Sequence, residues 1–330
     1  MLGTIVAINC MLNMLFPISN PSSAIPGATI ISYQKEKITV MSPGGVVFVG
    51  DSSLGNSLDA KLLGSIIDVD CYNLSLVASY TLMADYYLIK YLAKRVKPRA
   101  IVISHAFSLI EKSDTYGRNE KVLARVFDEH ENPFQDFILH NVYMVRNQAI
   151  AKAILFKERF GLNSNFLSAY QTASHSTVSL GMYGENDYPP QGEPINLASN
   201  YVPPRKEHYS YDFVDKWLSL CAELCKEHDI ELYFMYNPLL KEFDSANFDY
   251  YEHITSHIVK ITPKMGIVFL DLNNPTFPSE YLGDTFYHLH PSMKQHYTRW
   301  LGKILAQSPL CGFSVNDFNE AVRNNPLQWP

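Results

Sequence analysis

Cysteine is scarce in this sequence, and the few cysteines are odd in number. The chain of 330 residues contains five of them, Cys10, Cys71, Cys221, Cys225 and Cys311. A sparse, odd set does not build a disulfide framework, so we expect buried free thiols. Cys221 and Cys225 have helical i, i+4 spacing, but no second Cys/His pair at metal-ligand spacing follows them. We therefore expect neither a disulfide-rich scaffold nor a metal site.

An excess of positive charge is missing as well. The 27 Lys and Arg residues are outnumbered by 33 Asp and Glu residues, which gives a net charge of −6. Proteins that bind nucleic acids usually carry a basic patch, so we expect no nucleic-acid partner. Residues 50–55 contain two glycines but lack the spacing and the lysine of a P-loop. This excludes a P-loop NTPase, and we expect no cofactor.

Charged side chains are absent from the first 34 residues. Residues 1–18 are mostly apolar, at the lower limit for a membrane span and within the range of a signal-peptide core. No basic segment precedes them, which leaves a buried helix as the alternative. We favour a membrane anchor or uncleaved signal, which places the protein outside the cytoplasm, in the periplasm or at the cell surface. Residues 19–40, rich in Pro, Ser and Gly at their start, are expected to form a linker.

Strands and helices alternate after this linker. We expect strands at 46–49, 71–76, 100–104, 232–236 and 267–272. We expect helices at 53–63, 82–93, 217–227, 250–260 and 292–305. This alternation predicts a parallel sheet with right-handed crossovers. The result is one α/β domain at 41–310, followed by a C-terminal tail at 311–330.

One long stretch, at about 111–205, interrupts the alternation. It contains a predicted helix at 133–156 and a polar, charge-poor region at 168–204. Loops this long in a compact domain are usually functional or disordered. We interpret the stretch as a lid or substrate-binding insertion after the third strand.

A serine stands where the first expected strand ends and a helix begins. Residues 46–49 (VVFV) run directly into residues 50–54 (GDSSL), so Ser52 lies at the carboxyl end of a strand. Unpaired N–H groups at a helix start can stabilise an oxyanion, and a serine hydroxyl needs a neighbouring base to become a nucleophile. The alternative is that Asp51, Ser52 and Ser53 only cap the following helix.

An acid and a histidine lie in the loop before the last expected helix. Loops at the carboxyl ends of parallel strands share one edge of the sheet, so Asp284 and His288 can approach Ser52. We expect His288 to act as general base and then general acid, and Asp284 to orient its ring. His290 lies in the same loop and is the alternative base.

These segments resemble the SGNH, or GDSL-like, hydrolase superfamily. Residues 50–54 are similar to its first block, which contributes the nucleophile, and residues 284–288 to its last block, with an acid-to-histidine gap of four instead of three. Residues 288–291 (HLHP) resemble the form found in polysaccharide-acetylation branches, which favours His288 as the base. The resemblance implies a flavodoxin-like three-layer sandwich with a central parallel five-stranded sheet, the SGNH hydrolase fold.

The resemblance also implies an oxyanion hole, and here the sequence departs from the family. Residues 72–76 (YNLSL) are similar to the second block, with Ala78 at the position of a glycine whose N–H is a donor. The third block, usually Gly-x-Asn-Asp, is replaced by residues 104–107 (SHAF). The expected donors are therefore Ser52, Ala78 and His105, with Ser104 as a substitute for His105, or two donors only.

The resemblance implies a serine esterase or O-acyltransferase that acts on acyl esters, above all acetyl esters, of an extracytoplasmic glycan through an acyl-Ser52 intermediate. The expected partners are an acylated carbohydrate or another ester substrate, and the membrane through the N-terminal segment. The alternative, favoured by the altered third block, is a catalytically inactive module of the same fold that binds a glycan or a protein.

Overall fold

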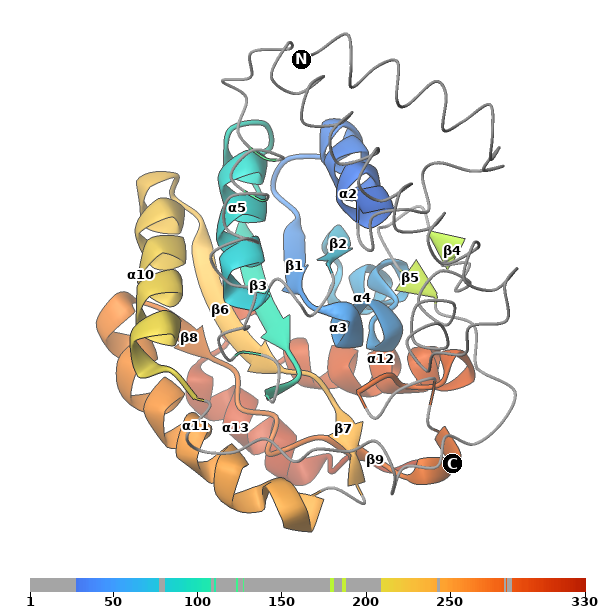
Figure 1. Ribbon diagram of the computed structural model, residues 1–330. Helices are drawn as coiled ribbons and strands as arrows, with labels where there is room; N and C mark the ends of the chain where they lie inside the picture. Colours follow the sequence, from blue (N-terminus) through green and yellow to red (C-terminus); the bar gives the residue numbers. More distant parts are fainter. Residues whose placement is uncertain are drawn as a thin grey trace, which may run out of the picture. The chain divides into compact units, whose positions relative to one another are not determined.

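The computed structural model is drawn in Figure 1. It describes residues 28–76, 81–107, 110, 123, 127, 179–180, 186–187, 209–241, 244–281, 283 and 287–330. Apart from the start of the first helix, these residues belong to one compact unit, Tyr33–Phe127 together with Val178–Pro330. The anchor or signal expected at 1–18, the helix expected at 133–156 and most of the expected insertion lie outside the described residues.

Five parallel strands form the central sheet, as predicted. They are β1 (Val46–Gly50), β2 (Cys71–Ser75), β3 (Ala100–His105), β6 (Glu231–Tyr236) and β8 (Val268–Phe269). Their order across the sheet is β2-β1-β3-β6-β8, and every neighbouring pair is parallel. This is a doubly wound order, in which the chain first moves to one side of β1 and then to the other.

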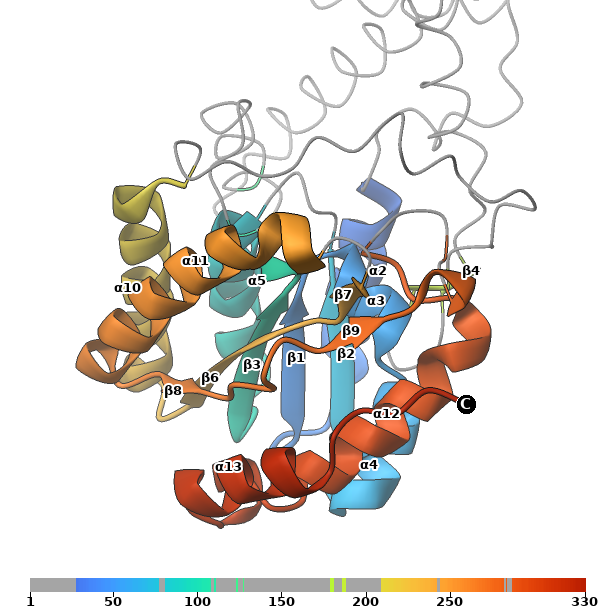
Figure 2. The same ribbon diagram turned by 90° about the horizontal axis from the view of Figure 1, so that it is seen from below.

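Helices cover both faces of the sheet and make it the middle of three layers (Figure 2). One face carries α5 (Thr81–Ala93), α10 (Tyr211–Glu227) and α11 (Asp244–Met265). The other face carries α4 (Ala60–Ile67), α12 (Pro291–Leu305) and α13 (Val315–Asn324). Short elements complete the described part: β4 (Ser179–Leu180) pairs with β5 (Asn186–Asp187), and β7 (Leu239–Leu240) with β9 (Thr276–Phe277). The α/β class and the layered architecture are therefore confirmed.

β1 is buried on both faces, as its continuous apolar sequence predicts. All of its residues from Val46 to Val49 are 0% exposed. Phe48 belongs to the apolar cluster that includes residues of α4, α12 and α13. On the other face, Trp217 of α10 packs against Tyr86 and Tyr87 of α5, with ring centroids 5.5 and 6.0 Å apart. This packing holds β1, the strand that ends two residues before Ser52.

The helix expected at 53–63 is in fact two helices, α3 (Ser52–Ser57) and α4. Asn73 of β2 donates its side-chain amide to the carbonyl oxygens of Leu54 (3.2 Å) and Leu58 (3.0 Å). Asp59 then caps α4 by accepting a hydrogen bond from the Leu62 N–H at 2.9 Å. Because Asn73 satisfies the carbonyls at the end of α3, the chain can turn there and begin a new helix.

Residues 28–40 correct the expected linker, because they form α2 (Ala28–Val40). Ile31 and Ile38 are buried, and the buried Gln34 side chain donates to the Ser75 carbonyl oxygen at 3.0 Å. The proline and glycine residues of this stretch end at Gly27, so nothing in residues 28–40 breaks a helix.

The expected C-terminal tail is also corrected, since residues 315–324 form α13. Ser314 and Asp317 make a capping box at its start. Phe318 and Val322, four residues apart, bury one face of the helix in the same cluster as Phe48. Beyond the helix, the Trp329 indole N–H donates to the Thr276 carbonyl oxygen at 2.8 Å. The i, i+4 spacing of apolar residues in this helix was readable from the sequence.

Within the described part of the chain, no helix is both long enough and apolar enough to cross a membrane. The segment expected to be an anchor, 1–18, is not among the residues covered by this statement.

A close approach of β1 and β3 at Gly50 yields the first prediction. Gly50 pairs with Ser104, and a Cβ atom at position 50 would lie 1.8 Å from the Ser104 carbonyl oxygen. We expect Gly50→Ala to lower the free energy of unfolding by about 3 kcal/mol or more, because backbone must move to admit the methyl group. Urea unfolding followed by circular dichroism measures this change.

Gly44→Ala is the matched control. A Cβ atom there meets nothing within 4 Å, and only the positive φ of +83° opposes the change, at a cost of about 1 kcal/mol. Equal losses in the two variants would contradict a close contact between β1 and β3 at Gly50.

Candidate active site

Polar side chains gather at the carboxyl edge of the sheet, where β1 lies between β2 and β3. Ser52 follows β1, His105 ends β3, Asn237 follows β6, and His288 precedes α12. This is the point where the strand order reverses, and open α/β sheets bind their ligands in the crevice there.

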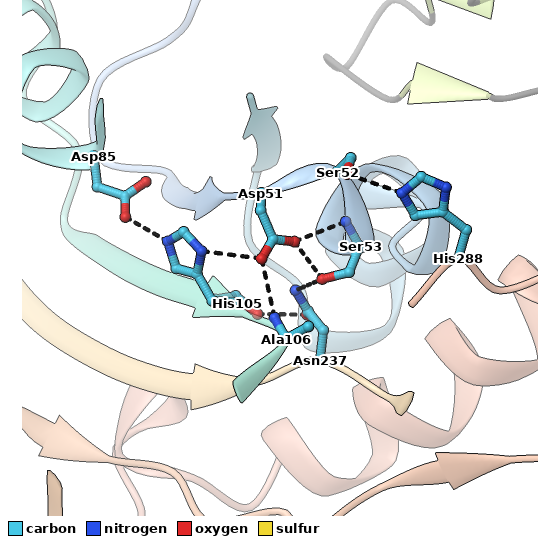
Figure 3. A network of polar contacts seen from close by, with 9 residues as sticks. Asp51, Ser52, Ser53, Asp85, His105, Ala106, Asn237 and His288 are labelled. Carbon is cyan, nitrogen blue, oxygen red and sulfur yellow. Dashed lines mark hydrogen bonds and ion pairs between the residues drawn. The ribbon is translucent and has the colours of Figure 1, made fainter. Parts of the chain in front are cut away.

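Ser52 and His288 meet at this edge although they are 236 residues apart in the sequence. The Ser52 Oγ lies 2.8 Å from His288 Nε2 (Figure 3). Ser52 is 8% exposed and His288 is 6% exposed, so the pair is largely shielded from solvent. The structure thus brings together two of the three side chains expected to form the catalytic set.

The loop that carries His288 is closed by backbone hydrogen bonds. The Gly283 N–H donates to the His288 carbonyl oxygen at 2.7 Å, and the His290 N–H donates to the Tyr281 carbonyl oxygen at 2.8 Å. A Cβ atom at position 283 would lie 2.8 Å from the same His288 oxygen, so a glycine is required there. Asp284, the expected acid, lies outside the described residues and stays a prediction.

His290, the alternative base, has a different task in the structure. Its Nδ1 accepts a hydrogen bond from the Ser292 N–H at 3.3 Å and lies 2.7 Å from Ser292 Oγ, so that it caps α12. Since His288 contacts the Ser52 hydroxyl and His290 caps a helix, the geometry favours His288 as the base.

Asp51 caps α3, and this role coexists with the placement of Ser52. The Asp51 Oδ1 accepts the Ser53 N–H at 2.7 Å and the Ser53 hydroxyl. Its Oδ2 accepts the Ala106 N–H at 3.1 Å and lies 3.0 Å from His105 Nδ1. The two interpretations of residues 51–53 are therefore compatible: the acid caps the helix, and the next residue presents its hydroxyl to His288.

His105 does not take the position expected of an oxyanion donor. Its Nδ1 faces Asp51 and its Nε2 lies 2.5 Å from Asp85 Oδ2, so both ring nitrogens are occupied by carboxylates (Figure 3). The Ser104 hydroxyl, the expected substitute, donates to Asn237 Oδ1 at 2.6 Å. Both side chains are buried in these contacts, which corrects the expectation for the third block.

Of the other expected donors, Ala78 lies outside the described residues. The Ser52 N–H is the first amide of α3, a position whose N–H has no partner within the helix. The role of the Ser52 N–H as an oxyanion donor stays a prediction.

Burial and charge act in opposite directions on His105. Burial alone lowers the pKa of its imidazole, but the Asp85 charge and the hydrogen bond that the ring donates to Asp51 outweigh it and raise the pKa from 6.5 to about 10. Burial also raises the pKa of Asp85, and the neighbouring His105 offsets part of this rise. The His105 imidazole between Asp51 and Asp85 is therefore protonated at neutral pH.

Asp85 and Asn237 were not anticipated as site residues. Asn237 donates its side-chain amide to Ser53 Oγ at 2.8 Å, in addition to accepting from Ser104. In the sequence, Asn237 lies just past a buried strand, and the same kind of position identified Ser52 as a candidate. Asp85 is an acid on the apolar face of α5, three residues after Leu82 and three before Leu88, and all three are buried.

No known protein-family model matches the chain, and no curated protein is significantly similar to it. Among the residues that the structure describes, no group of three or more His, Cys, Asp or Glu side chains could hold a metal ion.

The raised pKa of His105 yields the second prediction. A group whose pKa is raised in the folded state stabilises the fold fully below its unfolded pKa and loses this effect as pH rises through the folded pKa. Between pH 6.5 and about 10, we expect the unfolding free energy of the wild type to fall by several kcal/mol relative to His105→Asn. Urea unfolding across this pH range measures it.

The comparison with His105→Asn removes the contributions of thiols and phenols that ionise in the same range, because both proteins contain them. Parallel pH curves for the two proteins would show that His105 is not held protonated.

Proposed function

We propose that the protein is a serine esterase or O-acyltransferase of the SGNH-like type, which works through an acyl-Ser52 intermediate. The observation that carries the proposal is the 2.8 Å contact between Ser52 Oγ and His288 Nε2 at the carboxyl edge of the sheet. His288 is the general base, and Asp284 is proposed to orient its ring.

The first half of the reaction acylates the serine. Ser52 Oγ attacks the carbonyl carbon of the ester while its proton passes to His288 Nε2. The negative charge that develops on the carbonyl oxygen is stabilised by the Ser52 N–H at the start of α3. Collapse of the tetrahedral intermediate breaks the bond between the carbonyl carbon and the alcohol oxygen, and His288 returns the proton to the leaving alcohol.

The second half removes the acyl group. Water, or a hydroxyl group of a sugar, gives its proton to His288 and attacks the acyl carbon. The bond to Ser52 Oγ breaks, and Oγ recovers the proton from His288. Hydrolysis and transfer use the same side chains, so the two activities differ in which acceptor reaches the acyl-enzyme.

The SGNH-like assignment is supported by the doubly wound five-stranded sheet and by residues 50–54 at the end of β1. The proposed substrate is an acyl ester, above all an acetyl ester, of an extracytoplasmic glycan, and the protein is proposed to be tethered by residues 1–18. Of the insertion, β5 contacts α3, the helix that begins with Ser52. This neighbourhood is consistent with a role of the insertion in substrate binding.

A second candidate is a non-catalytic module of the same fold that binds a glycan or a protein. The observation that favours it is the burial of Ser104 and His105 in contacts with Asn237, Asp51 and Asp85. Neither side chain is directed to an oxyanion, so fewer donors are available than in a complete oxyanion hole.

Acylation of Ser52 separates the two candidates. After incubation with p-nitrophenyl acetate, we expect intact-mass and peptide analysis to find an acetyl group on Ser52 of the wild type. Ser52→Ala should carry none, because its nucleophile is gone. Release of acetate from acetylated polysaccharides, measured on the same proteins, tests the substrate class.

Ser65→Ala is the matched control, since Ser65 is an exposed serine of α4 that donates only to the Leu62 carbonyl oxygen at 2.7 Å. It should be acetylated as the wild type is. Equal acetylation of the wild type and Ser52→Ala would reject Ser52 as the nucleophile.

The predicted acid is tested by Asp284→Asn. If Asp284 orients His288 and stabilises its protonated form, the acylation rate constant should fall by about ten-thousandfold. The control is Glu280→Gln, an acid of the short helix Ser279–Tyr281 in the same loop region. Stopped-flow release of p-nitrophenol gives both rate constants, and similar values for the two variants would remove Asp284 from the proposed site.

A further inference from the structure

A carboxylate, an imidazole and a second carboxylate stand in line behind the proposed nucleophile (Figure 3). They are Asp85 of α5, His105 at the end of β3, and Asp51 at the end of β1. We propose that His105 is a positioning residue, which holds the Asp51 carboxylate so that Ser52 faces His288. This inference rests on the proposed function for its effect on rate, but its geometric part does not.

Asp51 is linked to Ser52 through the chain and through the hydrogen bonds of Ser53. Ser52 lies between Asp51 and Ser53 in the chain, and the Asp51 carboxylate binds the N–H and the hydroxyl of Ser53. The Ser53 hydroxyl also accepts the Asn237 amide at 2.8 Å. Asp51, directly before Ser52, carries this carboxylate, and Ser53, directly after Ser52, is hydrogen-bonded to it. The position of the Asp51 carboxylate therefore fixes the chain on both sides of Ser52 and sets the direction of the Ser52 side chain.

Asp51 is also linked to His105, at the end of β3. The Asp51 carboxylate is buried, and a buried charge is costly without a partner. His105 Nδ1 at 3.0 Å and the Ala106 N–H at 3.1 Å supply two donors from the end of β3. The Ala106 contact comes from the backbone, so His105 is the side chain through which this end of β3 can adjust Asp51.

His105 is in turn linked to Asp85, on α5. An imidazole ring can present either nitrogen as a donor, and its neighbours decide which. Asp85 Oδ2, 2.5 Å from Nε2, fixes the ring orientation that turns Nδ1 towards Asp51. Asp85 lies on α5, which packs against β1 and α10, so the ring is fixed from a different layer of the fold.

The other oxygen of Asp85 argues for function over stability. Asp85 Oδ1 is buried and has no hydrogen-bond partner among the described residues. An unpaired buried oxygen costs free energy, and a buried ion pair is seldom more stable than an apolar contact of the same shape. An arrangement that an apolar contact of the same shape could replace without loss of stability, and that lies next to the proposed nucleophile, is expected where it serves the site.

Two substitutions of His105 each remove one of its two contacts and keep the other. In His105→Asn, the amide nitrogen replaces Nδ1, so that the donor to Asp51 is kept and the contact with Asp85 is lost. In His105→Gln, the longer side chain brings its amide nitrogen to the place of Nε2, near Asp85, and the donor to Asp51 is lost. If His105 positions Ser52 through Asp51, the two variants should therefore differ in acylation rate and in the distance from Ser52 Oγ to His288 Nε2.

The first experiment measures the rate constant of acylation by p-nitrophenyl acetate in single-turnover stopped flow, on protein shown to be folded by circular dichroism. We expect the acylation rate constant to fall tenfold or less in His105→Asn and about a hundredfold in His105→Gln, because small displacements of a reacting group lower the rate by such factors. His257→Asn, which removes a 2.7 Å contact with Asp215 outside the site, should keep the wild-type rate. Equal rates in both His105 variants and the wild type would overturn the proposal.

The second experiment determines crystal structures of the same two variants. The distance from Ser52 Oγ to His288 Nε2 should stay within hydrogen-bond reach in His105→Asn and exceed it in His105→Gln. An unchanged distance in both variants overturns the positioning role, whether or not the wild type is acylated. If the wild type is not acylated but the distance changes as expected, the proposed function fails and the positioning role stands.

Asp85→Asn keeps the test decisive if His105→Gln does not fold. The asparagine preserves the shape of Asp85 and can still accept from Nε2, but it removes the charge that holds the ring. A roughly tenfold loss of the acylation rate constant, by the same displacement argument, and a lengthened Ser52–His288 contact support the proposal. A wild-type rate and distance in folded Asp85→Asn reject it.

Discussion

The candidate site depends above all on one buried carboxylate, that of Asp51. It lies at the end of β1 and receives two donors from the start of α3 and two from the end of β3. These contacts join the nucleophile turn to the neighbouring strand. The two oxygens of a carboxylate can accept four donors between them, and burial makes each hydrogen bond stronger than it would be in water. The direction of the Ser52 side chain follows from this arrangement.

The fold supplies the conditions that allow this carboxylate to be buried. β1 is covered by apolar side chains on both faces, and Gly50 lets its end approach the Ser104 carbonyl oxygen. The doubly wound order places β3 beside β1 and the loop before α12 at the same edge. A tightly packed sheet thus positions groups from distant parts of the sequence, and the hydrogen bonds among them refine their orientation.

Much of the fold and part of the site could be predicted from the sequence. Continuous apolar runs such as 46–49 mark strands of a sheet covered on both faces, and polar residues just past such strands mark its functional edge. That reasoning found Ser52 and His288, and it could have found Asn237. It did not determine the direction of the His105 ring, because that depends on Asp85, a residue of a helix whose register against the sheet is a tertiary property. The helix α2 was missed because the Pro- and Gly-rich composition of the preceding residues was extended too far.

The central claim is that Ser52 is a nucleophile activated by His288. The most direct measurement is a crystal structure of the protein after treatment with a fluorophosphonate, in which Ser52 Oγ would displace fluoride from phosphorus and pass its proton to His288. The account predicts a bond between phosphorus and Ser52 Oγ, with His288 Nε2 within hydrogen-bond reach and a phosphonyl oxygen directed to the Ser52 N–H. An unmodified Ser52, or phosphorus bound to another side chain, would contradict it.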